Sequence, residues 1–250
     1  MNGIFVTGTD TGVGKTFTTC GLISAFSGLG KRVGVLKPAE TGCALQDDIL
    51  IPEDATRLAA FADTTVPLNL VCPYRFAPPL APSVAAAQAG VTINPSHLAA
   101  VYHHIAARHD MTFVEGAGGL LVPLVGRYTF ADLARDLALP VLVVVGSKLG
   151  ALNHTLLTLR YAEGQRLPLL GYIINHPYPE VDEATRTNAQ TLRELTDVPC
   201  LGVIPFTQLR GDIDQDRHLL GNICNGFITK FLDSQAPDQT FRRLDFLTSS

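Results

Sequence analysis

Residues 3–16 read GIFVTGTDTGVGKT, and this stretch decides the fold class. It begins with apolar and β-branched residues, as a strand does, and a helical pattern follows Gly14. A glycine-rich turn that ends in Gly-Lys-Thr between a strand and a helix is the pattern of a P-loop, in which backbone N–H groups at a helix N-terminus face phosphate oxygens. The strict spacing requires glycine at position 9, but Thr9 stands there and Gly8 lies one place earlier. The alternative is an ordinary tight strand–helix turn.

Further along the chain, short β-branched runs alternate with longer helical patterns. The run 141–145 is apolar at every position, as in strands that are buried on both faces of a parallel sheet. This alternation predicts an α/β fold, a doubly wound and mainly parallel sheet with helices on both faces. We expect strands at residues 3–7, 32–36, 111–115, 140–145, 169–174 and 200–204, and helices at residues 15–28, 54–62, 95–108, 130–138, 151–163, 182–196 and 216–232.

The composition is that of a folded protein. Of 250 residues, 46% are hydrophobic and 17% are charged, which excludes intrinsic disorder, and the net charge of −4 makes general binding to nucleic acid a poor fit. Five cysteines without a CxxC pair predict neither a disulfide framework nor a zinc site. We find no pattern of a signal peptide or membrane span and expect a cytoplasmic protein with one domain over residues 1–233 and a polar tail over residues 234–250.

Polar residues follow the expected strands where ligands bind in open parallel sheets, beyond the carboxyl ends. Three of the five lysines lie at these ends, namely Lys15, Lys37 and Lys148, which indicates an anion site. In a P-loop, Lys15 would reach the β- and γ-phosphates and the hydroxyl of Thr16 would bind Mg²⁺.

A second acidic anchor for Mg²⁺ is expected at the end of another strand. Glu115 ends the strand at 111–115 and is followed by glycines, so we assign it this role; the alternative is a surface glutamate at a strand end. Asp54 opens an expected helix, and two interpretations stay open: it completes the Mg²⁺ shell, or it caps that helix.

Lys37 is not needed by the P-loop. A second lysine at a neighbouring strand end predicts a second anion near the γ-phosphate, which is what a phosphoryl acceptor would be. Thr11 and Thr41 are candidates to supply hydroxyl groups to it. The alternatives are a solvated strand-end lysine and, for the two threonines, ordinary loop structure.

Several blocks of sequence, in order along the chain, resemble the dethiobiotin synthetases. They span about residues 3–232, and the shifted start of the P-loop is what this family shows. The blocks are Gly8–Thr11, Gly14–Thr16, Lys37–Gly42, Tyr74–Pro82, Val114–Gly119, Leu149–His154, Asn175 and Leu201–Pro205.

The resemblance implies an ATP- and Mg²⁺-dependent ligase with a P-loop NTPase-like fold that acts as a homodimer with sites at the interface. It would convert 7,8-diaminononanoate, CO₂ and ATP to dethiobiotin, ADP and phosphate, through a carbamate and a carbamic-phosphoric anhydride. The implied residues are Lys15, Lys37, Thr11 and Thr41 for catalysis; Gly12, Val13, Gly14, Lys15, Thr16, Asn175 and Pro205 for the nucleotide; Lys37, Thr41, Gly150, Asn153 and Asn188 for the substrate; and Thr16, Asp54 and Glu115 for Mg²⁺.

Three positions differ from some members of the family. Gly12 stands where some carry an acidic residue, Thr41 where serine is also used, and Asn188 where some have a tyrosine that contacts the substrate carboxylate.

Two other classes of protein share a P-loop of this kind. The amidating ligases of cobalamin synthesis also carry a glutaminase domain, for which 250 residues leave no room. Switch ATPases of the MinD and ParA type carry a signature lysine where Asp10 stands here. Phosphate release that depends on the diamine separates the synthetase from both.

Overall fold

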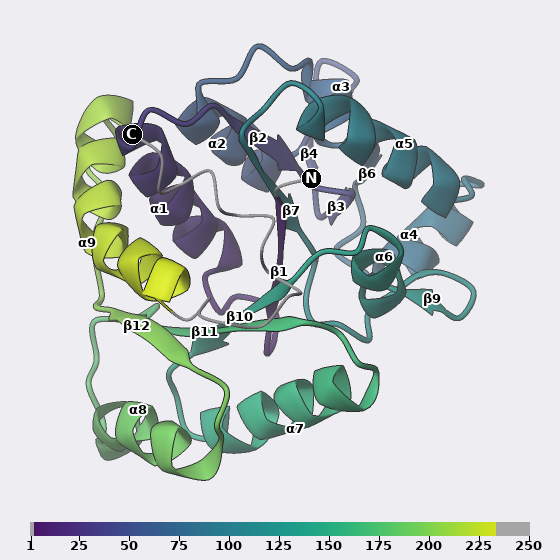
Figure 1. The fold of residues 1–250 in the computed structure, drawn as a ribbon. Coiled ribbons are helices and arrows are strands. Elements are labelled where there is room, and N and C mark those ends of the chain that lie inside the picture. Colours follow the sequence, from purple (N-terminus) through teal and green to yellow (C-terminus); the bar gives the residue numbers. More distant parts are fainter. Residues whose placement is uncertain (1–2, 234–250) are drawn as a thin grey trace.

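A six-stranded sheet, parallel at every pairing, forms the centre of the fold in the computed structural model of the chain, which describes residues 3–233 (Figure 1). Its strands lie in the order β12-β11-β10-β1-β7-β2. They are β1 (Gly3–Gly8), β2 (Val33–Leu36), β7 (Met111–Glu115), β10 (Val141–Gly146), β11 (Leu169–Asn175) and β12 (Cys200–Ile204).

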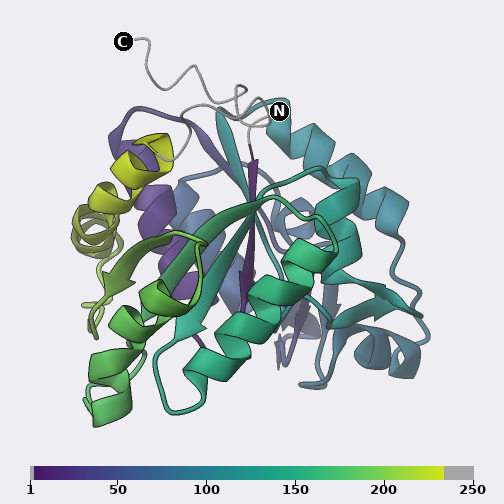
Figure 2. The same cartoon turned by 60° about the horizontal axis from the view of Figure 1, so that its bottom comes forward.

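Strand β10 shows why both faces of this sheet need helices. Val141, Val143 and Val145 belong to one hydrophobic cluster, whereas Leu142 and Val144 belong to the other, because successive side chains of a strand point to opposite faces. The first cluster includes residues of α5 (Pro95–Ala106), α6 (Phe130–Asp136), α7 (Ala151–Gly164) and α8 (Glu183–Leu195), and the second includes residues of α1 (Lys15–Gly28), α2 (Glu53–Ala62) and α9 (Ile213–Asp233). Figure 2 views the molecule with α7 and α8 in front of the sheet.

The shorter elements border the carboxyl end of the sheet and its edge. Two short helices are α3 (Leu68–Val71) and α4 (Pro82–Gln88). Three two-stranded sheets are formed by β3 (Ala39–Thr41) with β6 (Tyr74–Phe76), β4 (Ala44–Gln46) with β5 (Ile49–Ile51), and β8 (Pro123–Val125) with β9 (Tyr128–Thr129).

The predicted fold class is confirmed. All six expected strands and all seven expected helices are present with ends shifted by a few residues, the helix at 216–232 starting at Ile213. The expectations omitted the short elements, because strands of two or three residues are specified by their pairing partners rather than by a local pattern. The predicted tail over residues 234–250 lies outside the described residues.

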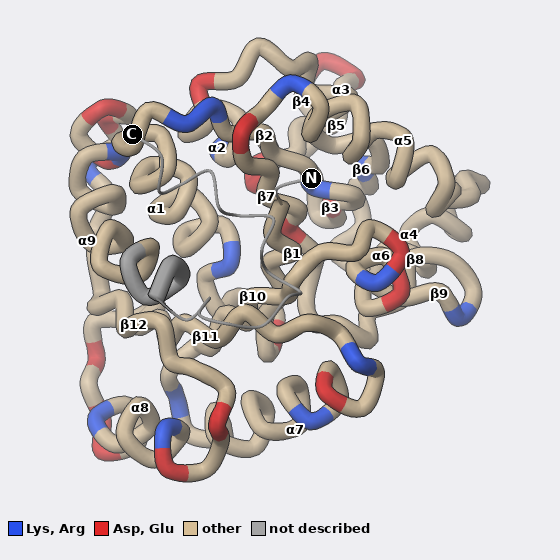
Figure 3. The backbone as a smooth tube through the Cα atoms, in the orientation of Figure 1, with Lys and Arg blue, Asp and Glu red and all other residues tan. Residues whose placement is uncertain are grey.

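Charged positions gather on the helices and loops around the sheet, with both signs mixed (Figure 3). Within residues 3–233, no helix combines the length and the apolar character that crossing a membrane requires.

Candidate active site

The loop between β1 and α1 leaves several backbone N–H groups free. Gly12 and Gly14 have φ of +73° and +90°, a left-handed conformation that favours glycine, and a Cβ at Gly14 would also collide with the amide of Asn175. No side chain caps the N-terminus of helix α1. The first backbone N–H of the helix with a hydrogen-bond partner is that of Thr18, which donates to the Gly14 carbonyl. In the described part of the chain, the N–H groups at positions 15–17 have no partner. Free N–H groups at a helix N-terminus form a site for anions such as phosphate.

Lys15 lies in the same loop. Its Nζ donates to the Asp10 carbonyl at 3.1 Å. Burial and, next, the nearby charge of Lys37 lower the pKa of Lys15 to about 8. An anion bound in the loop would counter both effects, since it favours the charged form of the lysine.

Glu115 is the centre of a buried hydrogen-bond network. Its side chain has no exposed surface. One carboxylate oxygen accepts from Thr16 Oγ1 at 2.8 Å and from Lys37 Nζ at 2.7 Å, and the other accepts from Thr19 Oγ1 at 2.7 Å. The interpretation of Glu115 as a surface residue is therefore wrong, and its carboxylate is fixed beside the hydroxyl of Thr16.

Lys37 is neither solvated nor unpaired. Its side chain is 2% exposed, and its Nζ also contacts Asp54 Oδ2 at 2.8 Å, so it bridges two carboxylates. The interpretation of Lys37 as a solvated strand-end lysine is therefore wrong. Lys37 was also expected to face a second bound anion, and two carboxylates of the protein already contact it. Burying an ammonium group without such partners would cost several kcal/mol.

Glu40, rather than Asp54, caps α2. The N-cap residue Pro52 offers no side-chain hydrogen bond, and both Glu40 carboxylate oxygens accept from backbone N–H groups, those of Asp54 and Ala55, at 2.9 Å. The interpretation of Asp54 as the cap is therefore wrong. Its own carboxylate is free to face Lys37. Desolvation raises the pKa of Asp54, but Lys37, Thr16 and Lys15 together hold that pKa below its ordinary value.

We expect Glu40→Gln to destabilise the protein by about 1–2 kcal/mol, because the amide can accept only one of the two bonds and leaves a buried N–H without a partner. Urea unfolding measures the loss. Glu53→Gln, an exposed change in the same helical turn, is the control and should cost much less. Equal losses in the two variants would contradict the capping role.

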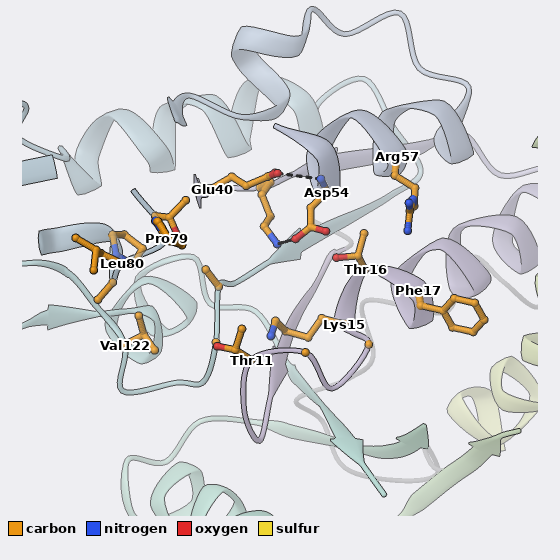
Figure 4. A pocket seen from close by; sticks show the side chains of 18 residues that line it. Thr11, Lys15, Thr16, Phe17, Glu40, Asp54, Arg57, Pro79, Leu80 and Val122 are labelled. Carbon is orange, nitrogen blue, oxygen red and sulfur yellow. Dashed lines mark hydrogen bonds and ion pairs between the residues drawn. The ribbon is translucent and has the colours of Figure 1, made fainter. Parts of the chain in front are cut away.

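One cavity of about 600 Å³ unites these groups (Figure 4). In the figure, the side chains of Thr11, Lys15, Thr16 and Asp54 all point into it. The predicted site residues that line it are Thr11, Gly12, Gly14, Lys15, Thr16, Lys37, Thr41 and Asp54, and Glu115 contacts two of these from behind.

Sequence reasoning assigned no role to several residues of this cavity. Glu40 and Arg57 line it, and so do residues 79–82 on its far wall. Glu40 lies within the short strand β3, which no local pattern in the sequence predicts. Arg57 is one turn beyond Asp54 on α2, a spacing that places both on the same helix face.

The remaining predicted residues lie outside this cavity. Val13 and Asn175 are buried, and the Asn175 amide donates to the Val13 carbonyl at 3.0 Å, so it supports the loop from behind. Asn188 is also buried; its amide donates to Ser147 Oγ and to the Lys148 carbonyl at 3.2 and 3.1 Å. Exposed positions are Pro205, after β12, and Gly150 and Asn153, at the start of α7.

The oxygens of Thr16, Asp54 and Glu115 are of the kind that Mg²⁺ prefers, and the bond between Thr16 and Glu115 brings two of them together. Across residues 3–233, no three His, Cys, Asp or Glu side chains are grouped to hold a metal ion by themselves. The donor set fits Mg²⁺ nevertheless, since this ion is commonly bound by one or two carboxylates together with water and substrate phosphates.

Comparison with known proteins identifies the family. The chain matches a family model described as an AAA domain over residues 2–212. It is 40% identical over 219 residues to an ATP-dependent dethiobiotin synthetase of Thermodesulfovibrio yellowstonii, which covers 84% of this chain and 91% of that protein. The chain belongs to the dethiobiotin synthetase family. A dethiobiotin synthetase of Anaeromyxobacter dehalogenans is 42% identical over 223 residues, covering 89% and 97% of the two chains.

Solved structures agree on the fold of this dethiobiotin synthetase family member. A chain of the MinC:MinD cell division protein complex of Aquifex aeolicus superposes with a TM-score of 0.56 at 13% identity, covering 96% of this chain and 99% of that one. The septum site-determining protein MinD of Pyrococcus horikoshii, complexed with Mg-ADP, superposes with a TM-score of 0.53 at 18% identity, covering 94% of this chain and 96% of that one. At these identities the likeness concerns the fold alone, and it confirms the predicted P-loop NTPase-like architecture. The predicted family is likewise confirmed, and with it the prediction that the chain is an enzyme.

Proposed function

We propose that this chain converts 7,8-diaminononanoate and CO₂ to dethiobiotin, with ATP converted to ADP and phosphate. The observation that carries the proposal within the family is Lys37. Its ammonium group is fully buried beside Thr16, held by two carboxylates, and lines the same cavity as Lys15 of the P-loop. Two lysines at one phosphate site suit a reaction in which a phosphoryl group passes to an acceptor that is itself an anion.

The proposed chemistry has three steps. One amine of the diamine attacks CO₂ and, on losing a proton, becomes a carbamate. A carbamate oxygen attacks the γ-phosphorus of ATP, ADP leaves, and a carbamic-phosphoric anhydride forms. The second amine attacks the carbonyl carbon, phosphate leaves, and the cyclic urea of dethiobiotin closes.

Lys15 and Lys37 are proposed to stabilise the charge that develops on the transferring phosphoryl group. Thr11 and Thr41 donate hydrogen bonds to phosphate or carbamate oxygens. Such groups act mainly by positioning and electrostatics, because phosphoryl transfer leaves a protein little covalent chemistry to perform.

Mg²⁺ is the proposed cofactor, with Thr16, Asp54 and Glu115 as its protein ligands. When bound, it neutralises negative charge on the β- and γ-phosphates. Lys37 contacts the carboxylates of Asp54 and Glu115, so it lies beside the proposed metal ligands and can reach the transferring phosphoryl group.

The nucleotide base is proposed to lie beyond the carboxyl ends of β11 and β12, near Asn175 and Pro205. The Asn175 amide also donates to the Val13 carbonyl of the P-loop. Strand β11 would therefore contribute to both the phosphate end and the base end of the nucleotide. Gly12, Val13 and Gly14 supply the loop backbone.

The substrate carboxylate is proposed to be bound across a homodimer. The start of α7 offers a helix N-terminus at Gly150 and Asn153, a favourable place for an anion. Leu149, 84% exposed, and Leu157, 62% exposed, leave apolar surface on this segment that suits contact with a second copy. Asn188 contributes by holding the loop that precedes Gly150.

We expect the affinity for ATP to fall as the pH rises above about 8. The free protein begins to lose the Lys15 proton there, since its pKa is lowered to about 8. Bound polyphosphate favours the charged lysine, so above this pH binding must take up a proton and weakens by up to about tenfold per pH unit. Calorimetric titration across this pH range, in two buffers of different ionisation enthalpy, measures affinity and proton uptake together.

The matched variant is Lys15→Arg, whose guanidinium stays charged throughout. Its ATP affinity should be independent of pH over the same range. An equal pH dependence in the variant and the wild type would assign the titration to another group.

Phosphate release tests the proposed function. In the presence of Mg-ATP, release should require both the diamine and bicarbonate, and leaving out either should reduce it to background. Release that is indifferent to the diamine would contradict the proposal and would indicate an ATPase of this fold with another partner.

A further inference from the structure

Arg57 is a charged residue of the cavity that none of the roles above uses. It lies on α2, one turn beyond Asp54, and lines the cavity together with Thr16 and Phe17. Its side chain has no ion pair or hydrogen-bond partner among residues 3–233, although Asp54 is three residues away on the same helix. In Figure 4 its guanidinium points toward the space in front of Thr16 and Phe17.

A second observation also places the guanidinium of Arg57 beside the first turns of α1. Burial raises the pKa of the Cys20 thiol well above its usual range, and the charge of Arg57 opposes that rise. Cys20 is three residues after Phe17 on α1, so the guanidinium lies close to this helix.

The other charged side chains of the cavity have direct partners, which Arg57 lacks among residues 3–233. Lys37 contacts Asp54 and Glu115, and Lys15 reaches back over the loop to the Asp10 carbonyl. The N–H groups at positions 16 and 17 are also free, as described above. Guanidinium donors and free helix N–H groups therefore face the same space, an arrangement that a phosphate group satisfies with several hydrogen bonds.

We propose that Arg57 binds the polyphosphate of the nucleotide at the end nearest Phe17, on the part that ATP and ADP share. We assign Arg57 to this end rather than to the γ-phosphate because Lys15, which in a P-loop reaches the β- and γ-phosphates, lies on the other side of Thr16 (Figure 4). This inference rests on the proposed use of ATP. It makes α2 a nucleotide-binding element, with Asp54 for the metal and Arg57 for phosphate.

The test is calorimetric titration of Mg-ATP and of Mg-ADP into the wild type, Arg57→Ala and Arg57→Lys. Arg57→Ala should weaken both nucleotides by about tenfold, as expected for a charge-assisted hydrogen bond at an exposed site. The affinity of Arg57→Lys should lie between those of the wild type and Arg57→Ala, since lysine keeps the charge but cannot form a bidentate contact. Higher salt should reduce the difference from the wild type, because exposed charges are screened.

Arg186→Ala is the matched control: it removes an exposed helical arginine on α8, away from the cavity, and should leave both affinities unchanged. Unfolding curves for Arg57→Ala and the wild type should coincide, as expected for an exposed residue. Unchanged ADP affinity in a folded Arg57→Ala protein would overturn the inference, as would a loss confined to ATP, which would assign Arg57 to the γ-phosphate. A wild type that binds neither nucleotide would instead overturn the proposed function.

Discussion

Lys37→Met is expected to lower turnover by about 100- to 1000-fold while ATP still binds within a few-fold of the wild-type affinity. Methionine keeps much of the length and volume of the buried side chain but removes the charge that stabilises the transferring phosphoryl group. The P-loop, which supplies most of the phosphate contacts, is left in place. Single-turnover phosphate release at saturating substrates measures the chemical step, and calorimetry measures ATP binding.

This substitution also leaves the carboxylates of Asp54 and Glu115 without the ammonium group between them. Breaking a buried pair typically costs about 3–5 kcal/mol, so unfolding must be followed alongside activity, with and without Mg-ATP. Lys31→Met, outside the cavity, is the control. Turnover within a few-fold of the wild type in a folded Lys37→Met protein would contradict the role of Lys37 in the chemical step.

Glu115→Gln is expected to raise the Mg²⁺ concentration needed for half-maximal activity by about 10- to 100-fold. The amide has no negative charge, and its NH₂ group replaces one of the two carboxylate oxygens. Either the bond from Thr19 or the bonds from Thr16 and Lys37 therefore lose their acceptor. Mg²⁺ titrations of activity, and of ADP binding as a readout independent of turnover, measure the effect.

The matched change is Glu53→Gln on the exposed start of α2, which should leave both Mg²⁺ titrations as they are. If Glu115→Gln gives the same Mg²⁺ dependence as the wild type, Glu115 does not belong to the metal shell, and its buried network serves only to fix Lys37.

The features that sequence predicted well are those with a strong local signal. The P-loop carries its glycines at positions that need positive φ, as Gly12 and Gly14 show. An apolar run such as 141–145 has to be buried on both faces, so the parallel sheet follows from it. Since such a sheet collects its loops at one edge, the meeting of Lys15, Lys37 and Glu115 in one place could also be predicted.

The pairing inside the site could not be predicted in this way. Lys37 contacts Asp54, 17 residues away in sequence, and Glu115, 78 residues away, and such contacts depend on how α2 packs against the sheet. Asp54 at a helix start has the sequence pattern of a cap, yet Glu40 from β3 takes that position in space. Arg57 has the sequence pattern of any exposed helical arginine, and only the cavity distinguishes it.

The most direct test of the account is mass spectrometry of a reaction that contains the protein, Mg-ATP, bicarbonate and 7,8-diaminononanoate. We expect a product heavier than the diamine by CO₂ less water, formed in step with ADP and absent when ATP is omitted. ATP consumption without that product would contradict the central claim that the two lysines of this cavity serve the carboxylation and ring closure of a diamine.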